Sequence, residues 1–319
     1  MTRITLGSTL CALLVLTACT SGKTKAAFNP DTSPLTTKNI DAVKGQKATC
    51  AGPAVKTFNL EAIETNVNLG MGTSFAAWTY NGRIPAPVIE ACEGDKVVIN
   101  MTNKGTTAHG FDTHAMKIDA RHYSPVAPGK SMTIEKIVDT PGVFMYHCAS
   151  GPVTDIHIKS GIHGAMIVYP RKEQLRPARE IVVVEDAIYG VRDNEGFIPG
   201  TDPKMAQKND QAFSMFNGRM DNDAVRVNPG DLVRMYFVNV GPGVSSAHVI
   251  GTVLDRVYDG KDPIYGVQTY AIPSGSGAML EFYIPEEGVY PFVDHDKLAF
   301  LSYGLALPFA TPGVPAMGH

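Results

Sequence analysis

The chain of 319 residues contains one pattern twice, and this internal repeat constrains the fold more than any other feature. The segment "YNGRIPAPVIEACEGDKVVINMTNKGTTAHG" begins at Tyr80, and "FNGRMDNDAVRVNPGDLVRMYFVNVGPGVSSAHVIG" begins at Phe216. Both contain aromatic-Asn-Gly, a strand, Gly-Asp, an alternating strand ending in Asn, and Ala-His. Further on, "PGKSMTIEKIVDTPGVFMYHC" matches "PSGSGAMLEFYIPEEGVYPFVDHD". The sequence therefore predicts two copies of one domain.

Each copy has the pattern of a β-sandwich. Short alternating runs such as "KVVINMT" and "LVRMYFV" are bounded by Gly, Pro, Asn or Asp. The 31 Gly and 22 Pro fit many short strands joined by turns. We predict an all-β chain with a first domain over residues 46–172 and a second over 173–319. The linker falls near residues 170–177, before the strand in "REIVVVEDAIYG".

The charge balance argues against one class of partner. The net charge is −3 and 18% of the residues are charged, and no basic stripe is present. The chain therefore gives no electrostatic reason to expect nucleic-acid binding.

The N-terminus has the features of an export signal. Arg3 precedes the apolar run "LCALLVLTAC", which is too short to span a bilayer as a mature helix. Its end, Leu16-Thr17-Ala18-Cys19, resembles the bacterial lipobox, which implies removal of residues 1–18 and a lipid on Cys19. An ordinary cleaved signal with a chance Cys is the alternative. Residues 19–45 are polar and are expected to form a flexible tether.

We therefore expect a lipid-anchored protein at the periplasmic face of the outer membrane or at the cell surface. The chain has five cysteines, of which Cys11 lies in the signal and Cys19 carries the expected lipid. Cys50 and Cys92 are left over outside the candidate site of Cys148, and in an oxidising compartment two such residues suggest a disulfide. Two buried free thiols are the alternative.

The repeat also aligns a set of metal-ligand residues. His109 pairs with His248, and His147-Cys148 pairs with His295-Asp296, but the second copy has no Cys. One copy therefore holds a candidate thiolate site that the other has lost.

One thiolate and two imidazoles in a rigid sandwich suit type 1 copper, and His109, Cys148 and His157 supply them. Zinc would require a fourth donor, which Ile162 at the axial position does not provide. The alternative is a small buried Cys with two hydrogen-bonded core histidines.

Strand parity separates a second group of histidines from the first. If Cys148 points into the sandwich, His147 points out of it. His114 is expected to face outward as well, and His295 aligns with His147 in the repeat. Three imidazoles with an open position favour a catalytic metal between domains. The bond between His147 and Cys148 would give an electron a short covalent route between the two sites.

From about residue 48 to 312 the chain resembles the two-domain copper-containing nitrite reductases of the multicopper oxidase and cupredoxin superfamily. The residues carrying the resemblance are "HGFDTH" (109–114), "YHC" (146–148), His157, "AHVIG" (247–251) and "VDHDKLAF" (293–300). The resemblance implies two cupredoxin-like Greek-key domains and a homotrimer.

The resemblance also implies roles for individual residues. Type 1 copper would bind His109, Cys148 and His157, and type 2 copper would bind His114, His147 and a neighbouring subunit's His295. Asp112 and His248 would handle protons, and Ile250 would help to wall the substrate pocket. From the residues alone, Asp112 could instead be a turn residue and His248 a relic of the lost second copper site.

The implied reaction is the respiratory-type reduction of nitrite to nitric oxide, a step of denitrification. It needs one electron, delivered by a periplasmic cytochrome c or small cupredoxin, and two protons. A His and a carboxylate near a metal are suited to move those protons.

Two departures from the family pattern are visible. Ile162 stands where the axial Met is usual, which implies a three-coordinate copper with a raised reduction potential. Met166 is expected to be core filler, and His163 to point away from the axial position. The segment Met116–Tyr123 lacks the usual Gly-rich run, so the pocket entry is expected to differ.

Two other functions are considered. A laccase-like multicopper oxidase usually has four His-x-His pairs, whereas the nine histidines of this chain include no such pair. A non-enzymatic copper-binding or electron-transfer lipoprotein would need only the thiolate site, and the additional His114, His147, His295, Asp112 and His248 argue against it.

Overall fold

The computed structural model describes residues 43–295 and 305–315. The predicted signal, the lipid at Cys19 and most of the tether lie outside these residues. Among the described residues, no helix is long and apolar enough to cross a membrane.

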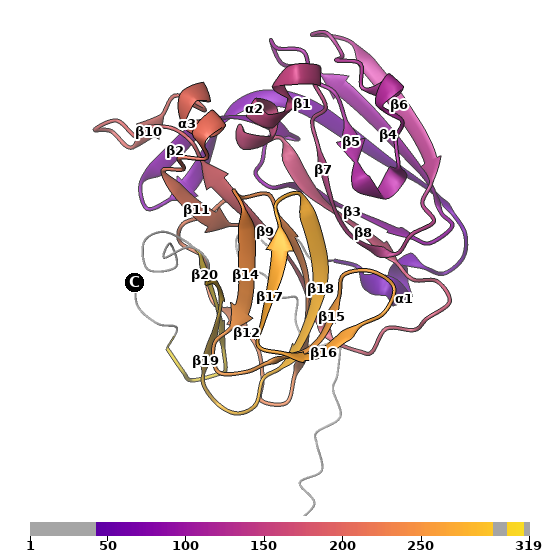
Figure 1. Ribbon diagram of the computed structural model, residues 1–319, viewed down its shortest axis with the longest axis vertical. Coiled ribbons are helices and arrows are strands. Elements are labelled where there is room, and N and C mark those ends of the chain that lie inside the picture. Colours follow the sequence, from indigo (N-terminus) through magenta and orange to yellow (C-terminus); the bar gives the residue numbers. More distant parts are fainter. Residues whose placement is uncertain (1–42, 296–304, 316–319) are drawn as a thin grey trace, which may run out of the picture.

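The first half of the chain forms two β-sheets (Figure 1). One has the order β10-β2-β1-β4-β6, with β1 (Val55–Gly70), β2 (Thr73–Tyr80), β4 (Lys96–Asn103), β6 (Ser131–Ile137) and β10 (Phe197–Ile198). The other has the order β3-β8-β7-β5, with β3 (Ala86–Cys92), β5 (Asp112–Thr113), β7 (Gly142–His147) and β8 (His163–Tyr169).

The second half also forms two sheets. The larger has the order β11-β9-β13-β18-β15-β16, with β9 (Arg179–Ile188), β11 (Phe213–Phe216), β13 (Leu232–Asn239), β15 (Leu254–Tyr258), β16 (Ile264–Val267) and β18 (Ser276–Tyr283). The smaller has the order β12-β20-β19-β14-β17, with β12 (Val225–Arg226), β14 (Val244–Val249), β17 (Thr269–Pro273), β19 (Val289–Asp294) and β20 (Ala306–Ala310). The predicted all-β class with two sandwiches is confirmed.

Helices are short and lie at loops and chain connections. They are α1 (Gly45–Thr49), α2 (Thr154–Lys159), α3 (Pro203–Lys208) and the 3-10 turns η1 (His114–Met116), η2 (Ala120–His122) and η3 (Gly151–Val153).

The sequence repeat reappears as repeated backbone geometry. Asn81 and Gly82 have φ values of 58° and 73°, and Asn217 and Gly218 have 53° and 67°. Only Gly and Asn adopt this left-handed region readily, which explains why Asn-Gly occurs in both copies. In each half the long strand after the turn pairs in parallel with the first strand, β4 with β1 and β13 with β9.

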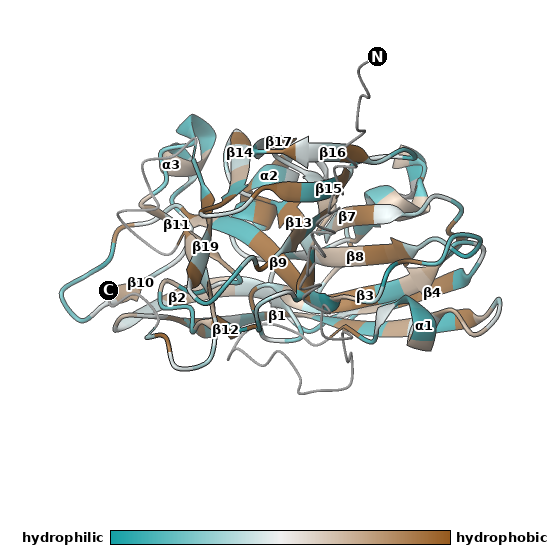
Figure 2. Ribbon diagram, turned by 90° about the horizontal axis from the view of Figure 1, so that it is seen from below, coloured by the Kyte–Doolittle hydropathy of each residue, from teal (hydrophilic) through white to brown (hydrophobic). Residues whose placement is uncertain are grey.

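The two halves are packed against each other. Val143 and Ile167 of the first half share one buried apolar cluster with Val184 and Tyr236 of the second. Figure 2 shows apolar segments of β8, β9 and β13 near the centre of the molecule. The short strand β10 lies beyond the predicted linker but pairs with β2, so the chain crosses back to the first sandwich.

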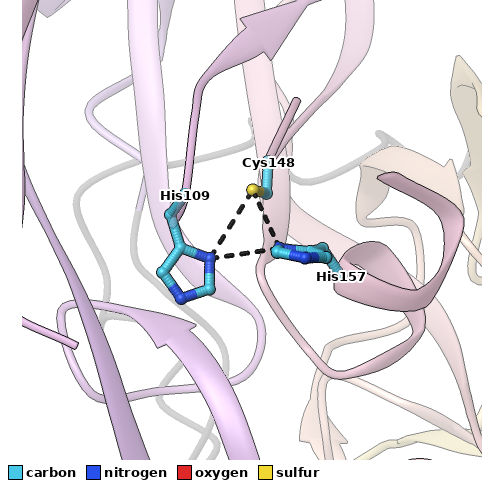
Figure 3. A group of neighbouring side chains, drawn as sticks. All are labelled: His109, Cys148 and His157. Atoms are coloured by element: carbon cyan, nitrogen blue, oxygen red, sulfur yellow. Dashed lines mark hydrogen bonds between the residues drawn. The ribbon is translucent and has the colours of Figure 1, made fainter. Parts of the chain in front are cut away.

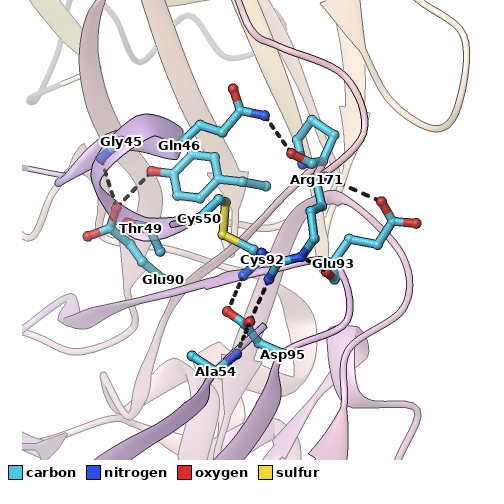
Figure 4. The surroundings of a disulfide bond; sticks show 12 residues. Gly45, Gln46, Thr49, Cys50, Ala54, Glu90, Cys92, Glu93, Asp95 and Arg171 are labelled. Carbon is cyan, nitrogen blue, oxygen red and sulfur yellow. Dashed lines mark hydrogen bonds and ion pairs between the residues drawn. A yellow bond between two sulfur atoms is a disulfide. The ribbon is translucent and has the colours of Figure 1, made fainter. Parts of the chain in front are cut away.

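The N-terminal end of the described chain is fastened to the first half (Figure 4). Cys50 and Cys92 form the expected disulfide, with their Cα atoms 5.6 Å apart. The Gln46 side chain donates to the carbonyl oxygens of Pro170 and Glu173 at 2.5 and 2.6 Å. Helix α1 is thereby tied both to β3 and to the linker between the halves.

Candidate metal centres

His109, Cys148 and His157 converge in the first half, as Figure 3 shows. They come from the β4–β5 loop, the residue after β7, and α2. Cys148 Sγ lies 3.7 Å from His109 Nδ1 and 3.4 Å from His157 Nδ1, and the two nitrogens are 3.2 Å apart. The circle through these three atoms has a radius of about 2.0 Å, which is the length of a first-row metal–nitrogen bond. The donor set therefore fits a trigonal metal ion.

Burial shifts the pKa values of these three ligands, and the shifts in the two histidines favour metal binding. It lowers the pKa of His109, and burial with the neighbouring His109 lowers the pKa of His157 to about 4. Both imidazoles are therefore neutral near pH 7 and free to bind a cation. Burial raises the pKa of the Cys148 thiol, while the Gly110 N–H, 3.2 Å from Sγ, favours the thiolate. A cation held by these residues would supply the rest of the stabilisation that the thiolate needs.

Aromatic and apolar side chains surround this first group. Trp78, the one Trp of the sequence, packs edge-on against both histidines, with ring centroids 5.4 Å from His109 and 4.5 Å from His157. His109, Cys148 and His157 are at most 2% exposed. Water is therefore largely excluded, as suits an electron-transfer site.

Ile162, the residue expected at the axial position, lies close to Cys148. Ile162 is fully buried in the cluster that contains Cys148, and its carbonyl oxygen accepts from the Cys148 N–H at 3.1 Å. Met166 is also buried there, with its Sδ 3.7 Å from Thr113 Oγ1. His163 bonds elsewhere, with Nε2 3.3 Å from Asp186 of the second half. The axial role of Ile162 stays a prediction.

Asp112, His114 and His147 form a second group, with one donor atom of each within 4.8 Å of the others. Strands β5 and β7 pair Asp112 directly with His147, and His114 follows in η1. His147 Nδ1 is 2.8 Å from the carbonyl oxygen of Cys148, which can only accept, so Nδ1 carries the hydrogen. This leaves His147 Nε2 free as a ligand, 3.8 Å from Asp112 Oδ2. Burial lowers the pKa of His147, which keeps this imidazole neutral.

The remaining two candidate histidines lie together in the second half. His248 is in β14 and His295 follows β19, with their rings 5.0 Å apart. His248 Nδ1 is 2.7 Å from the Gln268 carbonyl oxygen, so its Nε2 is free. Nearby, Ile250 is 40% exposed. Within one chain, neither His belongs to the group of Asp112, His114 and His147.

Sequence reasoning did not assign two residues that contact these groups. Trp78 packs on the first group, and the Tyr123 hydroxyl donates to Asp112 Oδ2 at 2.9 Å. Two features of the sequence could have pointed to them. One is the single Trp in the strand before the Asn-Gly turn, and the other is the Tyr in the divergent segment after His114.

The two sandwiches and the buried Cys-His-His group define a two-domain copper protein of the cupredoxin type. A family model described as "Multicopper oxidase" matches residues 61–173. The copper nitrite reductase from Nitrosomonas europaea is 32% identical, with a TM-score of 0.74, over 81% of this chain and 94% of that one. The copper-containing nitrite reductase from Thermus scotoductus is 27% identical, with a TM-score of 0.72, over 82% of this chain and 64% of that one.

A curated relative, the copper-containing nitrite reductase of Neisseria gonorrhoeae, is 32% identical over 256 residues, which are 76% of this chain. The alignment spans 65% of that relative's length. The chain belongs to the family of copper-containing nitrite reductases.

Proposed function

We propose that this protein reduces nitrite to nitric oxide, using copper at both donor groups. The observation that carries the proposal is that neighbouring residues serve different groups: Cys148 faces His109 and His157, whereas His147 faces Asp112 and His114. Bound copper would supply one-electron redox chemistry at each site. A simple electron carrier has no need of the second group.

The dipeptide provides the route for the electron. His147 and Cys148 share a peptide bond, and the His147 Nδ1–H returns to the Cys148 carbonyl at 2.8 Å. An electron received at the thiolate site would have a route to the second group through the covalent bonds of the dipeptide, with this hydrogen bond as a shorter link, and would not cross solvent.

Two residues are placed to handle protons. Nitrite takes up one electron and two protons and yields nitric oxide and water. Asp112 holds a carboxylate oxygen 3.8 Å from His147 Nε2, and would pass one proton to the substrate oxygen. The Nδ1 hydrogen of His248 is bound to the Gln268 carbonyl oxygen, so its Nε2 can take up a proton from solvent and would pass that proton on as the second one.

We propose that a second copy of the chain completes the catalytic site. His295 and Ile250 are exposed on the second half, and His114 is exposed on the first. A cyclic trimer would place the second half of one subunit over the first half of the next, and bring His295 and His248 to Asp112.

The direct test is nitric oxide production from nitrite by purified, copper-loaded protein with an artificial electron donor. His295→Ala should abolish turnover and keep the visible absorption of the copper–thiolate bond. Cys148→Ala should lose both. A wild type that takes up electrons at its thiolate copper but makes no nitric oxide would support the electron-transfer alternative.

Mixed trimers test the shared site. Trimers made only of His147→Ala subunits, or only of His295→Ala subunits, should be inactive. In a mixed trimer, a His295→Ala subunit supplies a first half with His147, and a neighbouring His147→Ala subunit supplies a second half with His295. Every mixed cyclic trimer would contain one complete site in three, so random assembly of equal amounts should restore about a quarter of wild-type activity. Co-expressed variants that stay inactive would exclude a site formed between subunits.

Export and the electron donor remain part of the proposal. We propose that Cys19 carries a lipid that anchors the protein outside the cytoplasm, and that a cytochrome c or small cupredoxin reduces it there. Labelling of wild-type cells with a radioactive fatty acid should mark the protein, and Cys19→Ser should remove the label.

A further inference from the structure

The segment after His114 folds back over the second donor group. Met116 and Ile118 are buried in the core of the first sandwich, and between them Lys117 has a left-handed φ of 48°. The 3-10 turn η2 follows, capped by the Asp119 side chain, which accepts from the Arg121 N–H at 2.9 Å. These anchors fix the direction of the chain as it reaches Tyr123.

Tyr123 ends this path with its hydroxyl at Asp112. Its ring is partly buried against the core cluster of the first half, and its Oη lies 2.9 Å from Asp112 Oδ2. The same Oδ2 is the atom 3.8 Å from His147 Nε2. Burial and the hydrogen bond to Asp112 raise the pKa of Tyr123 to about 12. In this contact the hydroxyl donates and the carboxylate oxygen of Asp112 accepts.

The hydrogen bond acts on a buried carboxylate. Asp112 lies on a strand of two residues, is only 7% exposed, and has two rotatable side-chain bonds that set where its oxygens point. A charge-assisted hydrogen bond fixes one oxygen and its direction. The Ile118 carbonyl oxygen, 3.3 Å from Tyr123 Oη, is a second acceptor for the same hydrogen, but the shorter contact is with Asp112 Oδ2.

We infer that Tyr123 is a positioning residue for the reaction: its hydroxyl fixes Asp112 Oδ2 beside His147, where the carboxylate would take up a proton from solvent and then pass it, as the carboxylic acid, to the nitrite oxygen. This inference rests on the proposed function. It assigns a task to the segment Met116–Tyr123, namely orientation of the acid-base carboxylate.

The test is Tyr123→Phe, which removes one oxygen and keeps the ring. In the copper-loaded trimer we expect kcat to fall about tenfold, the loss expected for one hydrogen bond to a charged group. KM for nitrite should stay within about twofold, because the carboxylate acts in the proton-transfer step rather than in initial binding. The copper–thiolate absorption should be unchanged, which shows that the first sandwich is intact.

Tyr270→Phe is the matched control. Tyr270 Oη donates to Asp259 Oδ2, also at 2.9 Å, in the second half. Its loss removes the same kind of bond away from Asp112 and should leave kcat unchanged. An equal fall in kcat in both variants would overturn the assignment, because the effect would then be general to tyrosine–aspartate bonds.

A crystal structure of Tyr123→Phe gives a readout that does not need turnover. We expect the Asp112 carboxylate to turn so that Oδ2 is no longer next to His147 Nε2. An unmoved carboxylate, or an unchanged kcat, would overturn the inference and leave the proposed function standing. A wild type without nitric oxide production would instead refute the proposed function, and the crystal comparison would then decide the position of Asp112 by itself.

Discussion

Replacing Ile162 with Met tests how the thiolate site is tuned. Ile162 is fully buried among apolar residues that include Cys148, and its carbonyl is bonded to the Cys148 N–H. The backbone at residue 162 is therefore held next to the ligand whatever its side chain. Ile and Met have similar volumes, so the exchange should cost less than about 1.5 kcal/mol of folding stability.

The expected effect on the reduction potential can be approximated. A long thioether bond stabilises Cu(II) more than Cu(I), so adding it lowers the potential. If that bond contributes about 2 kcal/mol, similar to a hydrogen bond to a charged group, the potential should fall by about 90 mV at 59 mV per tenfold change in a one-electron equilibrium. The copper would then become a stronger reductant towards the catalytic site and a weaker acceptor from the donor.

Redox titration of the copper–thiolate absorption measures this shift. Ile162→Leu is the matched control, because it alters the shape of the side chain without adding a donor, and its potential should equal that of the wild type. Met166→Leu should also have no effect, since the structure places Met166 Sδ beside Thr113 Oγ1. A potential within about 20 mV of wild type in Ile162→Met would refute the reasoning, and a rise in Met166→Leu would identify Met166 as the axial residue instead.

Three further predictions use other parts of the molecule. Copper added to the apoprotein should quench the fluorescence of Trp78, whose ring centroid is 4.5 Å from that of His157, and His157→Ala should abolish the quenching. Because the pKa of free His157 is about 4, this ligand should be protonated only as the pH falls towards 4; an NMR titration of the His157 ring in the apoprotein with a midpoint near pH 6 would contradict this. Removing the Cys50–Cys92 disulfide, which spans 42 residues, should lower the free energy of unfolding in urea by about 4 kcal/mol, and a loss below about 1 kcal/mol would show that the bond does not restrain the unfolded chain.

Much of the architecture could be predicted because both copies of the repeat have the same turn residues and the same alternating strand pattern. The Asn-Gly turns require left-handed φ values, and both copies adopt them at the same place. The predicted strands in "KVVINMT" and "LVRMYFV" became β4 and β13. The thiolate group followed from donor chemistry together with the spacing of Cys148 and His157.

The features that could not be predicted from the sequence depend on contacts between segments that show no periodic pattern of residues. Tyr123 lies 11 residues from Asp112 along the chain, and its approach depends on one left-handed residue and two 3-10 turns. Strand β10 has two residues, too few to show an alternating pattern, and it pairs across the predicted domain boundary. Neither contact could be read from the residue types alone.

Strand parity predicted the side to which His147 points, but not its exposure. Although it faces out of its own sandwich, His147 is only 7% exposed in the single chain, as is Asp112. Parity describes one sheet, whereas burial also depends on the loop after His114 and on the second half of the chain.

The exposed fractions separate the donors that one chain completes from those that, in the proposed trimer, a second chain would complete. His109, Cys148 and His157 are all at most 2% exposed, so the folding of one chain completes this donor group. His114 and His295 are exposed, and they belong to different halves. Dilution that dissociates the assembly should therefore release catalytic copper while the thiolate copper stays bound. Simultaneous loss of both would show that the thiolate site also depends on the neighbouring subunit, contrary to its burial within one chain.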